Sequence, residues 1–172
     1  MQLKISAPAD VHTEIRLPAS KSLSNRALMI HALSEAYTPL HNLSDCDDTT
    51  IMKAGLINNS ETINVQAAGT AMRFLTSYFA ILEGKTKILT GSERMQQRPI
   101  KILVDALRQL GAQIEYTGKE GFPPLKITGK KLKGGELTLP ADVSSQYTSA
   151  LMMIGPKLEN GLILHLDGTV SS

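Results

Sequence analysis

The sequence is organised around residues 17–26, which read Leu-Pro-Ala-Ser-Lys-Ser-Leu-Ser-Asn-Arg. Pro18 cannot continue a strand interior, so it ends whatever precedes it. Ser20 is a favourable helix N-cap, and the residues after position 26 are mostly apolar and good helix formers. We therefore predict a buried helix over about residues 21–35.

Two cations and a hydroxyl fall on the first turn of this predicted helix. Ser22 and Arg26 share one face, and Lys21 occupies the first position. The free N–H groups of a helix N-terminus carry partial positive charge, so the segment predicts an anion site, most simply for phosphate. The alternative is a surface helix with solvated charges. Because cations in a first turn oppose the helix dipole, the site is favoured over that alternative.

The composition indicates a globular protein with a substantial core: 172 residues, of which 42% are hydrophobic and 20% charged. A net charge of +2 and the lack of an aromatic stacking motif argue against a nucleic-acid partner. Cys46 is alone, which fits a reducing compartment. No apolar run approaches the length of about 20 residues that spans a membrane, and the N-terminus lacks a secretory h-region. We therefore expect a cytoplasmic protein without a membrane partner.

The rest of the chain alternates between short apolar runs and helical segments. We predict strands at residues 3–7, 13–17, 38–43, 61–66, 85–90, 112–117, 125–128, 136–139 and 162–166. Further helices are expected at about residues 48–58, 74–82, 99–110 and 148–156, with Pro99 as a first helical residue and Gly111 as a C-cap. Alternation of this kind, with some hairpins, predicts an α/β layered domain.

Three more predicted helix starts carry small or polar residues, at 69–73, 98–99 and 144–146. Gly69 permits close approach of another group. Arg98 precedes Pro99 and is held extended, which places its guanidinium at the mouth of the 99–110 helix. If all four starts point one way, they form a positive rim for anionic ligands. A Gly at a helix start by chance and a simple Ser cap remain the plain alternatives. The aspartates at 45–48 match no Ca²⁺ loop and are interpreted as helix capping, so no metal site is predicted.

Together, these stretches resemble the N-terminal half of the EPSP synthase (3-phosphoshikimate 1-carboxyvinyltransferase) family. The resembling segments are residues 17–26, 47–49, 68–73, 94–100, 105–107 and 143–147. The resemblance implies two inside-out α/β domains, each built from three βαβαββ units, that close over the substrates. It also implies the shikimate-pathway transfer of the enolpyruvyl group of phosphoenolpyruvate to the 5-hydroxyl of shikimate 3-phosphate, with release of phosphate and without a metal or organic cofactor.

The resemblance further implies roles for individual residues. Lys21 would contact both substrates and act in catalysis. Shikimate 3-phosphate would bind Ser22, Arg26, Ser144, Ser145 and Ser172. Phosphoenolpyruvate would bind Gly69, Arg98 and Gln146. Two residues depart from the family pattern: Ala19, where Gly is frequent, and Ala67, where Asn is frequent.

The family extends for more than this length again, so the resemblance implies that residues 1–172 are an N-terminal domain without its C-terminal partner domain. Residues 1–16 are then expected to associate with that partner. Such a fragment is expected to bind substrate weakly and not to turn over alone. The alternatives are a UDP-N-acetylglucosamine enolpyruvyl transferase relative and a non-catalytic phosphometabolite-binding module. The segments at 144–146 and 94–99 favour the shikimate enzyme.

Overall fold

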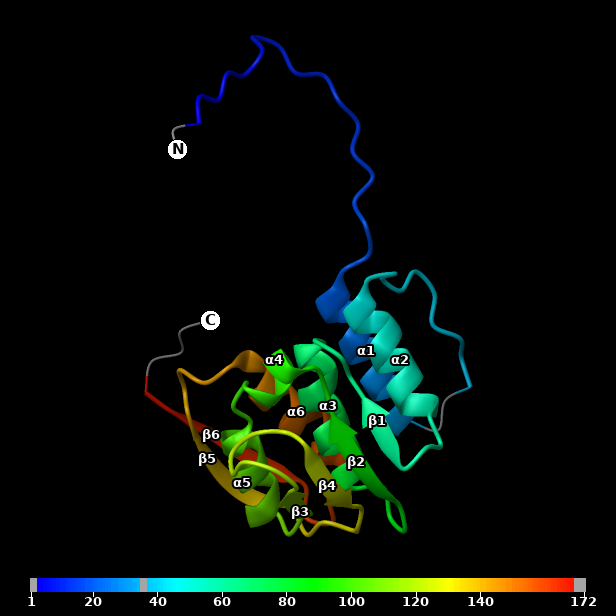
Figure 1. Cartoon of the computed structure of the whole chain (residues 1–172), viewed down its shortest axis with the longest axis vertical. Helices are drawn as coiled ribbons and strands as arrows, with labels where there is room; N and C mark the ends of the chain where they lie inside the picture. The colour runs from blue at the N-terminus through cyan, green and yellow to red at the C-terminus, as the bar shows by residue number, and fades with distance from the viewer. Residues whose placement is uncertain (1–2, 35–36, 169–172) are drawn as a thin grey trace.

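A βαβαββ unit occupies the middle of the chain in the computed structural model, which describes residues 3–34 and 37–168 (Figure 1). Its elements are β1 (Thr62–Asn64), α3 (Gly69–Ala80), β2 (Thr86–Thr90), α5 (Lys101–Gln109), β3 (Gln113–Tyr116) and β4 (Leu125–Thr128). The four strands form one sheet in the order β1-β2-β4-β3, with β1 parallel to β2 and the other pairs antiparallel. The α/β fold class is therefore confirmed, and this segment has the order of elements that the resemblance implies.

A second, smaller sheet follows this unit. It consists of β5 (Gly135–Pro140) and β6 (Leu162–Asp167), which pair in parallel, with Leu137 opposite Leu164. The crossover between them contains α6 (Ser145–Ile154) and a short 3-10 helix, Gly155–Lys157. A parallel pair requires such a crossover, because a tight hairpin reverses the strand direction.

Helix α3 is the centre of the core. All of its residues except Tyr78 are buried, among them Phe74, Leu75 and Phe79. Each strand of the four-stranded sheet alternates between buried and more exposed residues, so one face of that sheet packs on the helices and the other faces solvent. Helix α3 therefore lies inside and the four-stranded sheet outside it, as in the inside-out arrangement that the resemblance implies.

The two N-terminal helices follow the predicted boundaries closely. Helix α1 covers Lys21–Leu33, and the Ser20 hydroxyl caps it by accepting a hydrogen bond from the Leu23 N–H (3.4 Å). Helix α2 covers Asp47–Ile57, with Cys46 rather than an aspartate at the N-cap position. Its first turn contains Asp47 and Asp48, where negative charge is favoured by the helix dipole.

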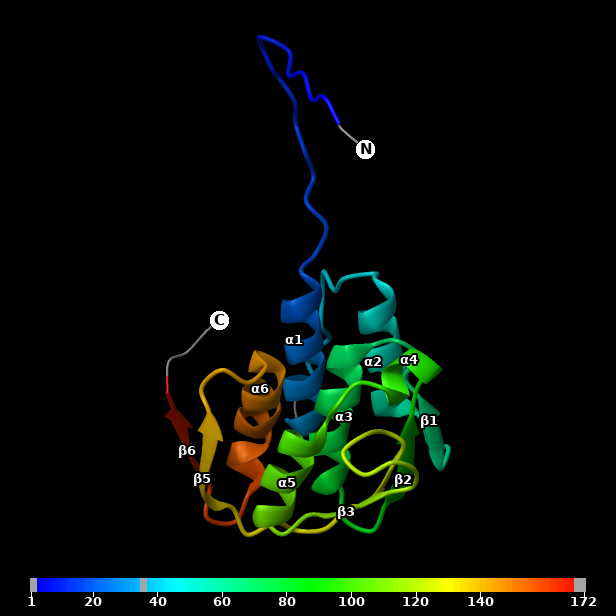
Figure 2. The same ribbon diagram turned by 60° about the vertical axis from the view of Figure 1, so that its left-hand side comes forward.

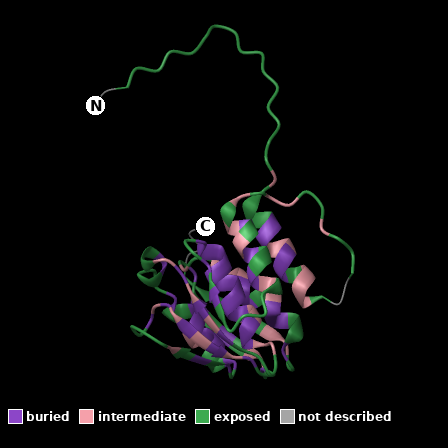
Figure 3. Cartoon of the chain, turned by 45° about the vertical axis from the view of Figure 1, so that its right-hand side comes forward, coloured by how far each residue is buried: buried purple, intermediate pink, exposed green. Residues whose placement is uncertain are grey.

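The strands predicted at residues 3–7, 13–17 and 38–43 are wrong, because none of these segments forms regular structure. Residues 3–18 run away from the folded part of the chain and are exposed along their length (Figures 1 and 3). Ile5 and Leu17 are 92% and 85% exposed. A strand needs a neighbour for its backbone N–H and C=O groups, and the described part of the chain offers these segments none.

The predicted start of α5 at Pro99 is also wrong, since the helix begins two residues later at Lys101. A short helix, α4 (Glu93–Gln96), precedes it. Ile100 has a non-helical φ of −136° and donates its N–H to the Gly121 carbonyl (2.9 Å). The Pro99 carbonyl is occupied by side chains from other elements, so it does not act as the first acceptor of the helix. At the other end, Gly111 follows the C-cap with a φ of +102°, as a C-terminal glycine should.

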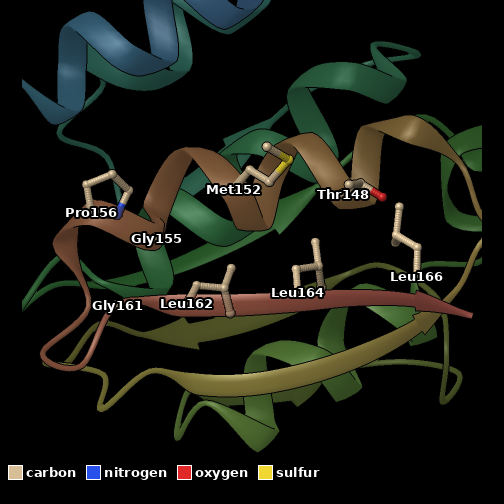
Figure 4. A pocket seen from close by; sticks show the side chains of 8 residues that line it. All are labelled: Thr148, Met152, Gly155, Pro156, Gly161, Leu162, Leu164 and Leu166. Carbon is tan, nitrogen blue, oxygen red and sulfur yellow. The ribbon is translucent and has the colours of Figure 1, made fainter.

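An apolar cavity of about 490 Å³ lies between α6 and β6 (Figure 4). Leu162 and Leu164 of β6 point from the strand toward α6, which contributes Thr148 and Met152 to the lining. No charged side chain lines this cavity, so it is unsuited to an anionic ligand. None of the helices within residues 3–34 and 37–168 has the length and apolar character needed to cross a bilayer.

Candidate anion-binding site

The starts of α1, α3 and α6 lie next to one another. Figure 2 shows all three helices beginning at their upper ends, the side from which the N-terminal segment leaves. Gln146 at the start of α6 donates to the Thr70 hydroxyl at the start of α3 (3.3 Å). Arg26 on α1 donates to the Ser149 hydroxyl on α6 (2.8 Å). Three N-terminal helix ends, each with partial positive charge, therefore face the same region.

Arg98 lies against Gly69, and not at the mouth of the helix that follows it. A Cβ placed on Gly69 would stand 2.5 Å from Arg98 Nη1 and 3.0 Å from Nη2, so the guanidinium occupies the space that a side chain would need. The restriction on a residue before proline predicts this guanidinium at the start of α5, whereas the structure places it against Gly69 at the start of α3. Arg98 and Gly69 are brought together as two residues of one predicted subsite.

A cavity of about 250 Å³ opens beside this arginine. Ala67, Arg94, Met95 and Arg98 line it. Ala67 contributes no polar side chain, so the polar character of the cavity comes from the two arginines. A small anion is the kind of ligand that such a lining favours.

Arg26 is held by three groups. Its Nη1 donates to the Ser22 carbonyl (3.1 Å) and its Nη2 to the Ser149 hydroxyl, while its Cζ lies 5.7 Å from the centroid of the buried Phe74 ring. Phe74 and Ser149 were not predicted from sequence. Ser149 follows Ser145 by four residues, about one helical turn. This spacing could have indicated that Ser149 lies on the same face of α6 as Ser145.

Lys21 is held far less firmly. Its side chain is 51% exposed, and its Nζ lies 3.8 Å from Asp48 Oδ1 at the start of α2. An exposed ion pair at this distance contributes little to stability, because both groups remain largely solvated. Lys21 is therefore at the expected helix start but is free to move toward a ligand.

Two of the serines expected near the 3-phosphate occupy different positions at the start of α6. Ser144 is the N-cap of α6, and its hydroxyl accepts the Gln146 N–H (3.3 Å), although it keeps its own O–H for another partner. Ser145 begins α6 and is exposed. Ser172 lies outside the described residues.

Arg73 is the most buried cation of this region, with 4% of its surface exposed. Burial lowers the pKa of its guanidinium below the usual range, and the neighbouring Arg98 cation lowers this pKa further, while Tyr147 acts in the opposite direction. Within residues 3–34 and 37–168, neither arginine pairs with a carboxylate. Adjacent cations without an acidic partner are an arrangement that a bound anion stabilises.

Residues 5–58 and 53–172 match the model of one protein family, EPSP synthase (3-phosphoshikimate 1-carboxyvinyltransferase). The chain belongs to the EPSP synthase family. Curated relatives agree: a 3-phosphoshikimate 1-carboxyvinyltransferase of Bacteroides fragilis strain YCH46 is 59% identical over 172 residues, and one of Shewanella sp. strain MR-7 is 38% identical over 197.

The family relatives are much longer than this chain. All of the chain aligns with 42% of the Bacteroides fragilis relative, and 99% of it aligns with 46% of the Shewanella relative. A solved EPSP synthase from Acinetobacter baumannii superimposes on 92% of the chain with a TM-score of 0.80 and 24% sequence identity, and the chain covers 41% of that structure. The structural likeness supports the fold, and the chain spans less than half the length of the relatives it matches.

Proposed function

We propose that this chain forms one wall of the active site of a 3-phosphoshikimate 1-carboxyvinyltransferase. The observation that carries this proposal is the Arg98 guanidinium, which lies against Gly69 at the start of α3 and has no carboxylate partner in the described part of the chain. The next residue of α3, Thr70, accepts a hydrogen bond from Gln146 at the start of α6. Family membership supplies the reaction class. Phosphoenolpyruvate carries a phosphate and a carboxylate, and a planar guanidinium can donate two hydrogen bonds to either.

The second substrate, shikimate 3-phosphate, is proposed to bind along the starts of α1 and α6. Arg26 would pair with its carboxylate, with Ser22 beside it on the same turn. Ser144 and Ser145 would donate hydroxyls to the 3-phosphate, which the N-terminus of α6 also favours. Ser172 is proposed to add a further hydroxyl. Seating two anions side by side requires several cations, and Lys21, whose exposed ammonium lies near Asp48 at the start of α2, would move toward both substrates.

The chemical role that these residues support is electrostatic. When the enolpyruvyl group moves to the 5-hydroxyl and phosphate departs, negative charge shifts on the phosphoenolpyruvate side. Arg98 would stabilise that charge, and Lys21 would do so once a ligand has ordered its ammonium, since donors held in place act most strongly where charge develops. The described wall offers no acidic side chain beside Arg98 to move protons, so we infer that the remaining family length supplies those groups. Residues 1–172 would then act as the N-terminal domain, with residues 1–16 contacting the second one.

The experiment that tests this proposal is a calorimetric titration of the chain with shikimate 3-phosphate, with shikimate as the matched ligand that lacks the phosphate. Weak but measurable binding of shikimate 3-phosphate and much weaker binding of shikimate are expected. An equal response to the two ligands would remove the assignment of Ser144 and Ser145 to the phosphate. The chain alone is expected to release no phosphate from the two substrates together.

A further inference from the structure

Pro99, the residue after Arg98, has a carbonyl oxygen that accepts two side-chain hydrogen bonds. Arg73 Nη2 of α3 donates to it at 3.1 Å, and the Tyr147 hydroxyl of α6 donates to it at 2.8 Å. A carbonyl oxygen has two lone pairs, so both are used. Proline also fixes its own φ and restricts the residue before it. The backbone on the C-terminal side of Arg98 is therefore fixed by donors from two separate helices.

Arg73 also contacts the other groups around Arg98. Its Nη1 donates to the Gly69 carbonyl (3.2 Å) and to the Met95 sulfur (3.7 Å). Gly69 is the residue against which the Arg98 guanidinium lies, and Met95 lines the same 250 Å³ cavity. The Met95 carbonyl accepts the Arg98 N–H (3.0 Å). The buried Arg73 side chain thus contacts three groups around Arg98: Gly69, Met95 in the turn before it, and Pro99 after it.

Tyr147 connects this loop to α6. It directly follows Gln146, its ring is buried, and the Arg73 Cζ lies 5.9 Å from the ring centroid. Because the hydroxyl reaches Pro99 while the backbone belongs to the first turn of α6, Tyr147 fixes the distance between the Arg98 loop and that turn. Neither Arg73 nor Tyr147 was among the residues to which the sequence assigned a role.

We propose that Arg73 and Tyr147 are positioning residues that hold Arg98 ready for an anion by clamping the Pro99 carbonyl. This inference rests on the proposed function, because it concerns the arginine proposed to bind phosphoenolpyruvate. Without the clamp, Arg98 would have to be ordered at the moment of binding, and affinity falls by the cost of that ordering. The buried positive charge of Arg73 also adds to the attraction for an anion at Arg98.

The test is a titration of the ¹⁵N-labelled chain with inorganic phosphate, followed through the arginine Nε–H signals in NMR spectra. We expect phosphate to shift the Arg98 signal, and Tyr147→Phe to weaken phosphate binding about three- to tenfold, the effect of one hydrogen bond. Arg73→Lys should weaken it more, because a single Nζ cannot replace two nitrogens, of which Nη1 reaches Gly69 and Met95 and Nη2 reaches Pro99. The matched control is Tyr116→Phe: the Tyr116 hydroxyl is buried without a hydrogen-bond partner in the described structure, so its loss should leave phosphate affinity unchanged.

Arg98→Ala separates this inference from the proposed function. If Arg98→Ala leaves phosphate affinity unchanged, the anion site itself is wrong and the clamp has no purpose. If Arg98→Ala abolishes binding while Tyr147→Phe binds phosphate like the parent chain, the clamp alone is wrong. Melting temperatures are measured for every variant. Should Arg73→Lys fail to fold, Tyr147→Phe, which retains the buried ring, decides the question.

Discussion

The Arg98 side and the Lys21 side of the candidate site hold their cations in opposite ways. On the Arg98 side, the loop is fixed by hydrogen bonds to the Pro99 carbonyl, and the guanidinium rests on Gly69. On the Lys21 side, a half-exposed ammonium meets Asp48 at 3.8 Å. By our proposal the first arrangement is ready for a ligand, whereas the second must be ordered by one. The difference suggests that this wall alone can select a small anion but cannot complete the site around Lys21.

The largest effect is expected from Lys21→Ala in a chimera that continues this chain with the remaining part of the Bacteroides fragilis relative. Loss of the ammonium should lower the rate of phosphate release by about 100-fold or more, as for other groups that stabilise developing charge. In the present chain the same substitution should change the free energy of unfolding by at most about 1 kcal/mol, because the ion pair is exposed. Turnover that survives Lys21→Ala would refute the catalytic role.

A smaller but still large effect is expected from Gly69→Ala. The new methyl group would stand 2.5 Å from Arg98 Nη1, so the guanidinium must move. Because the obstacle is the flexible end of a side chain, the melting temperature should hardly change, while phosphoenolpyruvate affinity falls about tenfold, or roughly 1.4 kcal/mol. Gly118→Ala is the matched control, since a methyl group there meets only Pro124 Cδ at 3.5 Å. Unchanged affinity in Gly69→Ala would mean that Arg98 does not bind from this position.

Arg26→Lys should have the smallest effect of the three. Lysine keeps the charge but cannot donate to both Ser22 and Ser149 while lying over Phe74. We expect shikimate 3-phosphate to bind about three- to tenfold more weakly by calorimetry. Ser149→Ala, which removes only one acceptor, should cost less than Arg26→Lys. If Ser149→Ala lowers the affinity for shikimate 3-phosphate more than Arg26→Lys does, Ser149 itself contacts the ligand and is not merely a support for Arg26.

The sequence predicts the local features of this molecule well and its long-range contacts poorly. Ser20 and the apolar run after it correctly predict the start of α1, and the strand at 125–128 is confirmed at both ends. The strand at 3–7 fails because a pairing partner cannot be inferred from one strand alone. Arg98 was expected at the helix after it, because sequence shows its neighbours along the chain but not Gly69, which reaches it only through the tertiary fold.

The same limit applies to the candidate site. The sequence indicates that helix starts carry cations and hydroxyls, and the contacts of Gln146 with Thr70 and of Arg26 with α6 bring three of those starts together. The sequence marks Arg73 as one more cation at a helix start and assigns no role to Tyr147, so it does not indicate that these residues hold others in place. Their role depends on a carbonyl, at Pro99, that belongs to a third element.

We propose above all that the starts of α1, α3 and α6 form one anion-binding wall. The most direct measurement is a titration of the ¹⁵N-labelled chain with shikimate 3-phosphate and phosphoenolpyruvate, followed at the backbone amides. We expect the signals of Ser22, Gly69 and Ser145 to shift and those of β1 and β3 to stay in place. Shifts confined to Leu162 and Leu164, at the apolar cavity between α6 and β6, or no shifts at the three helix starts, would contradict it.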